Sequence, residues 1–227
     1  MAQPMEPGTA SPVALQIERL TFRFPLPPGH LQPALFQDWS ARFGPGVSLV
    51  RAGDGGGKST LLRLLAGVLA PQAGRLTLHG AALAEQPLAY RAQVFWCDPA
   101  DAALDHLGAR DYLALRRGQH PAWDDAVLED DLAALGLRDH LDKPLHALST
   151  GTRRKLRLAA GLASGAPLTL FDDPFAALDL RSVDHVLDRL AECAECAAST
   201  GRALLVAHHT ALDGVPLAAL VDLPGPG

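Results

Sequence analysis

The chain has 227 residues, 48% of them apolar, which suits a globular protein with one large core or two small lobes. Its formal net charge of −5 and pI of about 5.9 argue against a nucleic-acid-binding surface, since residues 153–157 form the only basic stretch in the sequence. No apolar run approaches the roughly 18 residues that cross a bilayer, and the first residues lack the features of a signal peptide, so we expect a cytoplasmic protein.

The cysteine content agrees with that compartment, because the chain has only three cysteines. Cys193 and Cys196 lie in an alanine-rich stretch that we expect to be helical. No second cysteine pair is present to complete a zinc site, so no metal is expected there.

The N-terminal part predicts antiparallel β structure. Residues 1–12 contain three prolines and are expected to form a loose tail. Residues 13–24 alternate between apolar and polar side chains as a half-buried strand does, and residues 25–33 are rich in proline and glycine. We therefore expect a β-hairpin at an edge of the fold.

The central part predicts a parallel core. Residues 47–50, 168–171 and 203–207 are apolar runs without alternation, which is typical of strands covered on both faces. Between them, Leu61, Leu64, Leu65 and Val68 share one face of a helix that should end before Pro71. Residues 105–147 are expected to be helical, with Trp123 as a packing residue between short helices.

A glycine-rich loop, AGDGGGKST at residues 52–60, lies between the first of these strands and that helix. Its glycines let successive backbone N–H groups point inward, where they and the helix N-terminus can hold an anion. Lys58 adds a positive charge, and the Ser59 hydroxyl suits a magnesium ion that bridges two phosphates. Ala52 occupies a position where a glycine is usual. The nucleotide-binding residues expected in this loop are Gly53, Asp54, Gly55, Gly56, Gly57, Lys58, Ser59 and Thr60.

Three further motifs follow in order: LSTGT at residues 148–152, LTLFDD at 168–173 and PFAALD at 174–179. Together with the loop they resemble the ATP-binding cassette (ABC) ATPases, over about residues 20–209, including APQAGRLTLHG at 70–80. The resemblance implies an α/β fold with a P-loop NTPase core, a mostly parallel sheet, an N-terminal antiparallel β edge and an inserted helical subdomain. The implied single domain has a core lobe at 13–97 and 148–223, a helical subdomain at 98–147, and loose tails at 1–12 and 224–227.

The two acids of LTLFDD follow a strand whose carboxyl end should lie beside the loop. Asp172 is expected to hold magnesium through water. Asp173 stands where the family usually has a glutamate that orients or deprotonates the attacking water. The aspartate side chain is one methylene shorter than that of glutamate. We therefore expect slow hydrolysis unless the backbone brings the carboxylate closer to the water.

The segment LSTGT resembles the family signature, which contacts the γ-phosphate of ATP bound on the other subunit. Ser149 and Gly151 match it, whereas Thr150 and Thr152 replace the usual glycine and glutamine. The simpler reading is a helix N-cap. Residues 153–155 are all cationic, which the helix dipole disfavours unless a phosphate or an acidic group lies near.

Two other matches concern the dimer and the γ-phosphate. Ala177, Leu178 and Asp179 match the family's D-loop, which crosses between two cassettes and so implies a homodimer or heterodimer. After residues 203–207, His208 best matches the histidine that contacts the γ-phosphate, and His209 is the alternative. We expect Lys58, Asp173 and His208 to act in catalysis.

Two positions match less well. Phe24 occupies the place of an aromatic residue that stacks on adenine, and a core position is the alternative. The family has a glutamine after the strand at QVFWCDP, where this chain offers Cys97 or Asp98. We favour Asp98, which could bind metal and would add negative charge.

The expected function is the ATPase subunit of a transporter, with ATP and Mg²⁺ as cofactors and a separate membrane-spanning partner. That partner should hold the chain on the inner face of the membrane by docking around residues 98–115. The second hypothesis is a regulatory or degenerate cassette that dimerises on ATP and hydrolyses little. A cassette protein that acts on ribosomes or DNA is disfavoured, because neither a second cassette nor a long coiled coil is evident.

Overall fold

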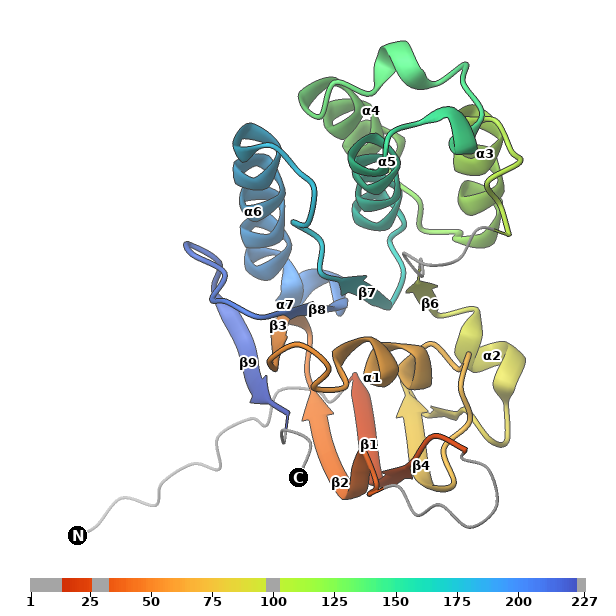
Figure 1. Ribbon diagram of the computed structural model, residues 1–227, viewed down its shortest axis with the longest axis vertical. Helices are drawn as coiled ribbons and strands as arrows, with labels where there is room; N and C mark the ends of the chain where they lie inside the picture. The colour runs from red at the N-terminus through yellow and green to blue at the C-terminus, as the bar shows by residue number, and fades with distance from the viewer. Residues whose placement is uncertain (1–13, 26–32, 97–102, 224–227) are drawn as a thin grey trace, which may run out of the picture.

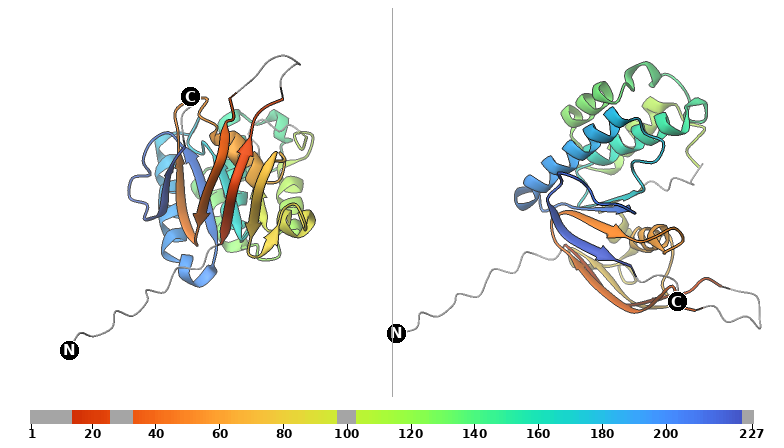
Figure 2. Two further views of the ribbon diagram at one scale, coloured as in Figure 1. Left: turned by 90° about the horizontal axis from the view of Figure 1, so that it is seen from below. Right: turned by 60° about the vertical axis from the view of Figure 1, so that its left-hand side comes forward.

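The computed structural model describes residues 14–25, 33–96 and 103–223. Two β-sheets lie in layers, with helices between them and above them (Figure 1; Figure 2, right). This arrangement is the expected α/β fold with a parallel sheet and N-terminal antiparallel strands.

The antiparallel strands form a sheet of their own, in the order β2-β1-β4-β5 (Figure 2, left). The strands are β1 (Leu15–Phe22), β2 (Phe36–Phe43), β4 (Ala73–Leu78) and β5 (Ala81–Ala82). β1 and β2 pair antiparallel on either side of the expected loop, as the hairpin prediction requires. β1 also pairs with β4, so it lies inside this sheet.

The parallel sheet has the order β6-β7-β8-β3-β9. Its strands are β6 (Val94–Trp96), β7 (Leu168–Asp172), β8 (Ala203–His208), β3 (Gly46–Arg51) and β9 (Leu217–Asp222). β3, β7 and β8 contain the three predicted apolar runs and are confirmed as parallel neighbours. The sequence reasoning missed β9, whose exposed, alanine-rich pattern carries no strong strand signal.

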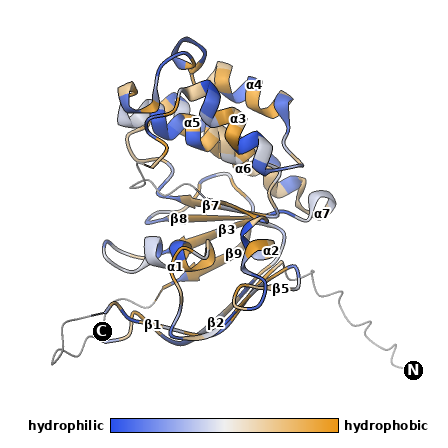
Figure 3. Ribbon diagram, turned by 90° about the vertical axis from the view of Figure 1, so that its right-hand side faces the viewer, coloured by the Kyte–Doolittle hydropathy of each residue, from blue (hydrophilic) through white to orange (hydrophobic). Residues whose placement is uncertain are grey.

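Helix α1 (Lys58–Leu65) lies between the two sheets (Figure 3). Leu61, Leu64 and Leu65 are fully buried there, as expected. Val68 is 63% exposed, which corrects the prediction that it shares the buried face. The helix ends at Leu65 because Gly67 adopts a left-handed backbone with φ of 70°.

The second layer of helices covers the other face of the parallel sheet, and so both faces of β3, β7 and β8 are buried (Figure 3). Its helices are α3 (Ala109–Gln119), α4 (Asp125–Ala134), α5 (Thr150–Ala163), α6 (Leu180–Glu195) and α7 (Ala197–Thr200). Residues 105–147 were expected to be helical throughout. Besides α3, α4 and two 3₁₀ turns, Arg138–His140 and Leu145–Ala147, the segment has non-helical stretches at 120–124 and 141–144, which corrects that prediction. A short helix, α2 (Pro87–Arg91), precedes β6.

Residues 105–147 pack onto α5, with Trp123 against the apolar core of this layer as expected. The predicted helical subdomain, residues 98–147, excludes α5, although α3 and α4 pack against it. The boundary of that subdomain therefore stays a prediction. Within the described ranges, no helix has the length and apolar character needed to cross a membrane.

Candidate nucleotide-binding site

The phosphate loop (residues 52–60) connects β3 to α1. Gly57 caps α1 with φ of 87°, and a Cβ there would lie 3.1 Å from the Leu35 side chain. A Cβ on Gly56 would lie 2.7 Å from the Cβ of Ala52, closer than real Cβ contacts allow. Ala52 therefore fits in the loop because Gly56, which faces it, has no side chain.

Lys58 begins α1 and reaches back over the loop. Its Nζ donates hydrogen bonds to the carbonyl oxygens of Ala52, at 2.7 Å, and Gly53, at 3.0 Å. No acidic residue occupies the first turn of α1, so the helix itself supplies no counter-charge to the positive end of its dipole. This end of the helix is electrostatically suited to an anion.

The two acids lie at the carboxyl end of β7. Asp172 pairs in register with Ala207 of β8, and the Asp173 N–H donates to the Ala207 carbonyl at 2.9 Å. The Asp173 backbone is left-handed, with φ of 46°, a conformation that aspartate tolerates better than most residues do. These backbone contacts set the direction of the Asp173 carboxylate.

His208 ends β8, and its Nδ1 lies 2.9 Å from Asp173 Oδ1. The residue is 8% exposed, and burial lowers its pKa below the ordinary value, although the neighbouring Asp173 carboxylate opposes that shift. The imidazole is therefore neutral at neutral pH. The sequence reasoning named both residues but not their contact.

His209 follows the strand and has an exposed side chain, with its ring centroid 4.3 Å from that of His208. The structure thus separates the two histidines that the sequence left as alternatives. His208 contacts the acid, whereas His209 lines the cavity described next.

The loop and the acids line one open cavity of about 450 Å³. Its walls are residues 54–60, Asp172, Asp173 and His209, together with Phe24 and residues 33–35. Phe24 is 42% exposed and packs edge-on against Phe22, so it lies on the cavity wall and not in the core. Gly53 belongs to the loop but does not line the cavity.

The donor set in this cavity suits Mg²⁺. Ser59 offers a hydroxyl oxygen and Asp172 a carboxylate oxygen, and hard oxygen donors are the ligands that Mg²⁺ prefers. The third expected ligand, Asp98, and its alternative Cys97 lie outside the described residues.

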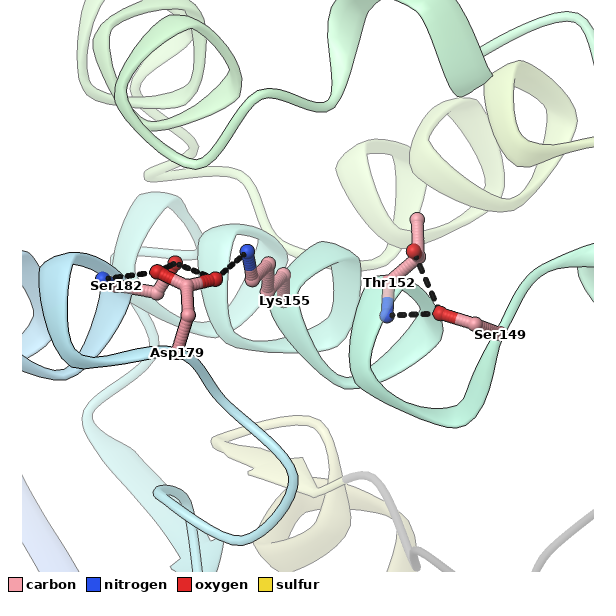
Figure 4. Close-up of polar contacts among 5 residues, drawn as sticks. All are labelled: Ser149, Thr152, Lys155, Asp179 and Ser182. Atoms are coloured by element: carbon pink, nitrogen blue, oxygen red, sulfur yellow. Dashed lines mark hydrogen bonds and ion pairs between the residues drawn. The ribbon is translucent and has the colours of Figure 1, made fainter.

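The signature segment (residues 148–152) begins α5 (Figure 4). Ser149 is the N-cap: its Oγ accepts from the Thr152 N–H at 3.1 Å and lies 2.8 Å from Thr152 Oγ1. The simpler N-cap reading is therefore correct for Ser149, and it is compatible with a binding role. Thr150 is exposed, and Gly151 is partly buried.

The D-loop (residues 177–179) passes directly over this segment. A Cβ on Gly151 would lie 2.5 Å from the Ala177 carbonyl oxygen, so only glycine fits. Asp179 caps α6 by accepting from Ser182 at 2.9 Å, and the Lys155 ammonium lies 2.5 Å from its carboxylate (Figure 4). These contacts, chiefly that with Lys155, hold the pKa of Asp179 well below its ordinary value.

The cations at the start of α5 have acidic or carbonyl neighbours within the chain. Arg153 lies 2.6 Å from Asp105, Lys155 contacts Asp179, and Arg154 donates to the Ala176 carbonyl at 2.5 Å. Residues of the same chain therefore provide the acidic groups that offset the positive charges at the N-terminus of α5.

A family model described as "ABC transporter" matches residues 37–176. The "Cytochrome c biogenesis ATP-binding export protein CcmA" of Pseudomonas putida is 37% identical over 177 residues, covering 78% of this chain and 83% of that protein. The "Taurine import ATP-binding protein TauB" of Pseudomonas aeruginosa is 35% identical over 198 residues, covering 85% and 73%.

Solved structures have the same fold at lower identity. One described as "ATP binding subunit of ABC transporter" has a TM-score of 0.72 at 21% identity, covering 86% of this chain and 79% of that one. A putative ABC transporter ATP-binding protein from Pyrococcus furiosus has a TM-score of 0.70 at 21% identity, covering 92% and 96%.

Proposed function

Since this chain belongs to the ABC transporter family as one of its ATP-binding subunits, we propose that it hydrolyses ATP to power transport through a separate membrane-spanning subunit. The observation that carries the proposal is the single cavity where the phosphate loop faces Asp172 and Asp173. The cavity lies at the carboxyl ends of β3 and β7, where ligands bind in open α/β sheets.

Each side chain has a separate task. The loop N–H groups and Lys58 hold the phosphates, while Ser59 and Asp172 hold Mg²⁺, which neutralises phosphate charge when bound. Asp173 orients the attacking water. His208 contacts the γ-phosphate and also holds the Asp173 carboxylate in place through the 2.9 Å contact. Phe24, which lines the same cavity, stacks on the adenine.

The working unit is a dimer of cassettes. None of Ser149, Thr150, Gly151 and Thr152 lines the cavity of the same chain, which supports a dimer in which a second cassette brings its signature segment to this site. The D-loop residues Ala177, Leu178 and Asp179 cross between the two copies. Leu180, next to them, is 82% exposed, which suits burial in that interface.

The membrane-spanning partner docks around residues 98–115 and holds the cassette on the inner face of the membrane. Leu115, in the described part of that region, is 39% exposed and offers an apolar contact. One relative is named as an export protein and another as an import protein, and both are named as ATP-binding. The proposal therefore assigns ATP binding and hydrolysis to this chain but no direction of transport.

We further propose that turnover is slow. The Asp173 carboxylate is one methylene shorter than the usual glutamate and is already engaged by His208. If Asp173 positions the water too far away, the second hypothesis, an ATP-dependent dimerising module with little hydrolysis, describes the protein better.

The first test is hydrolysis by the purified protein with ATP and Mg²⁺. Lys58→Ala should weaken ATP binding by roughly 2–4 kcal/mol, because a charge on the phosphates is lost. Lys143→Ala is the matched control, since Lys143 is an exposed lysine far along the chain from the loop. Equal affinity of the Lys58→Ala variant for a fluorescent ATP analogue would refute the site.

The second test concerns the acid. Asp173→Asn should stop hydrolysis and trap an ATP-bound dimer, which light scattering would detect. Asp173→Glu should accelerate hydrolysis if the short arm limits the rate, and should change it little if the backbone already compensates. Hydrolysis that persists in Asp173→Asn would remove the water-orienting role from this residue.

A further inference from the structure

Three metal-binding side chains meet at the carboxyl ends of β7 and β8. Asp173, His208 and His209 each offer a ligand atom, and these atoms all lie within 4.8 Å of one another. It is the one such group of three among residues 14–25, 33–96 and 103–223. The proposed hydrolysis uses Asp173 and His208 but assigns no chemistry to His209.

The backbone holds two of the three ligands in place. The Asp173 N–H bonds to the Ala207 carbonyl at 2.9 Å, and the adjacent parallel strands keep Asp172 opposite Ala207. His208 is buried and packs edge-on against Phe175, with ring centroids 5.1 Å apart. His209 is exposed, so its ring can turn to complete the set.

The distance between two of the ligand atoms is close to that around a coordinated ion, and both lie within 4.8 Å of the His209 ligand atom. Zinc binds histidine nitrogen and carboxylate oxygen at about 2.0–2.2 Å, which places two tetrahedral ligands about 3.4 Å apart. His208 Nδ1 and Asp173 Oδ1 are 2.9 Å apart, so they need to separate by only about half an ångström. Coordination through Nδ1 requires the imidazole proton to lie on Nε2, because a metal binds the unprotonated ring nitrogen.

The ligand types select the ion. Two imidazoles and one carboxylate suit late first-row divalent ions such as Zn²⁺, whereas the oxygen donors Ser59 and Asp172 suit Mg²⁺. The charges nearby are Lys58, which opposes a cation, and Asp172, which favours one. The two acids together outweigh the single lysine.

We propose that Asp173, His208 and His209 form a binding site for a late first-row divalent cation, for which Zn²⁺ is the probe. A bound ion occupies the Asp173 carboxylate and separates it from His208. ATP hydrolysis then stops, because the carboxylate no longer orients water; this consequence, unlike the binding itself, rests on the proposed function.

Binding is tested by calorimetric titration of nucleotide-free protein with Zn²⁺. The variant His209→Ala should bind at least about tenfold more weakly, because one of three ligands is lost. His106→Ala, which removes another exposed histidine, and Cys196→Ser, which removes an exposed thiol, should bind as the wild type does. Unchanged affinity in His209→Ala, or a loss in Cys196→Ser instead, would overturn the proposal.

The consequence is tested by ATP hydrolysis at excess Mg²⁺ and buffered free Zn²⁺. Zn²⁺ should inhibit the wild type and His106→Ala, while His209→Ala should need at least about tenfold more free Zn²⁺ for the same fractional inhibition. Equal inhibition of His209→Ala would refute the regulatory role. A wild type that binds Zn²⁺ but never hydrolyses ATP would contradict the proposed function and leave the metal site standing.

Discussion

The hydroxyl oxygens of Thr152 and Ser149 lie 2.8 Å apart at the start of α5 (Figure 4). Thr152 stands where the ABC family usually has a glutamine, and this contact gives the substitution a physical meaning. The threonine hydroxyl orients the serine hydroxyl that we propose to face ATP on a second cassette.

Removal of the Thr152 hydroxyl should therefore weaken the ATP-driven dimer. In an Asp173→Asn background, Thr152→Val should weaken dimerisation by about 0.5–1.5 kcal/mol at each of two sites, the worth of one hydrogen bond. Thr152→Ser keeps the hydroxyl and is the control. The monomer's own affinity for ATP should not change, since Thr152 does not line the cavity. Analytical ultracentrifugation with ATP measures the dimer, and equal dimerisation of the valine and serine variants would contradict the role.

Ala52 and Gly56 should behave as a coupled pair. In Gly56→Ala the new Cβ would meet that of Ala52 at 2.7 Å, so we expect a loss of about 1–3 kcal/mol in the free energy of unfolding. Ala52→Gly added to Gly56→Ala should restore part of it, because the new Cβ would still lie 3.0 Å from the Gly53 carbonyl oxygen. Gly53→Ala is the matched control, because a Cβ at Gly53 would meet nothing within 4 Å. Urea denaturation gives these values, and additive effects in the double variant would refute the coupling.

Asp131 should anchor α4 to α6. It is fully buried, with His185 Nε2 at 2.8 Å and Arg189 Nε at 3.0 Å. Asp131→Ala leaves these two bases without their shared acid and should cost roughly 3 kcal/mol of the free energy of unfolding. Glu192→Ala removes the exposed partner of Arg189 and should cost less than about 1 kcal/mol. Similar losses of unfolding free energy in urea denaturation for both variants would show that burial does not determine how much each ion pair stabilises the fold.

His208 should titrate below the ordinary histidine value of 6.5, because burial lowers its pKa. The unfolded chain then binds this proton more readily than the folded chain does. The stabilising contribution is therefore present above pH 6.5 and is lost as the pH falls from 6.5 toward the lowered value.

Replacement of Asp173 by Asn should lower the His208 pKa further, because the carboxylate raises it through a hydrogen bond and its charge. An NMR titration of the imidazole signals would measure both values, with His106→Ala as a control for assignment. A His208 pKa that does not fall in the Asp173→Asn variant would show that the contact at 2.9 Å does not form in solution.

Much of the local structure could be predicted from residue patterns. The runs at 47–50, 168–171 and 203–207 are uniformly apolar, and a strand covered on both faces needs that composition. The phosphate loop was also predictable, because its glycines and Lys58 have one well-defined use before a helix. Val68 was misplaced because the helical pattern continues past Leu65 although Gly67 ends the helix.

The sequence by itself thus determined the core strands β3, β7 and β8, helix α1, the phosphate loop and the acids at the end of β7, since each depends on side-chain type and spacing along a short stretch of chain. Only the tertiary structure decided that His208 contacts Asp173, that Gly56 makes room for Ala52, and that Asp179 pairs with Lys155. These contacts join residues on different strands, helices or arms of a loop. They depend on strand register and on backbone angles, which the spacing of residues does not encode.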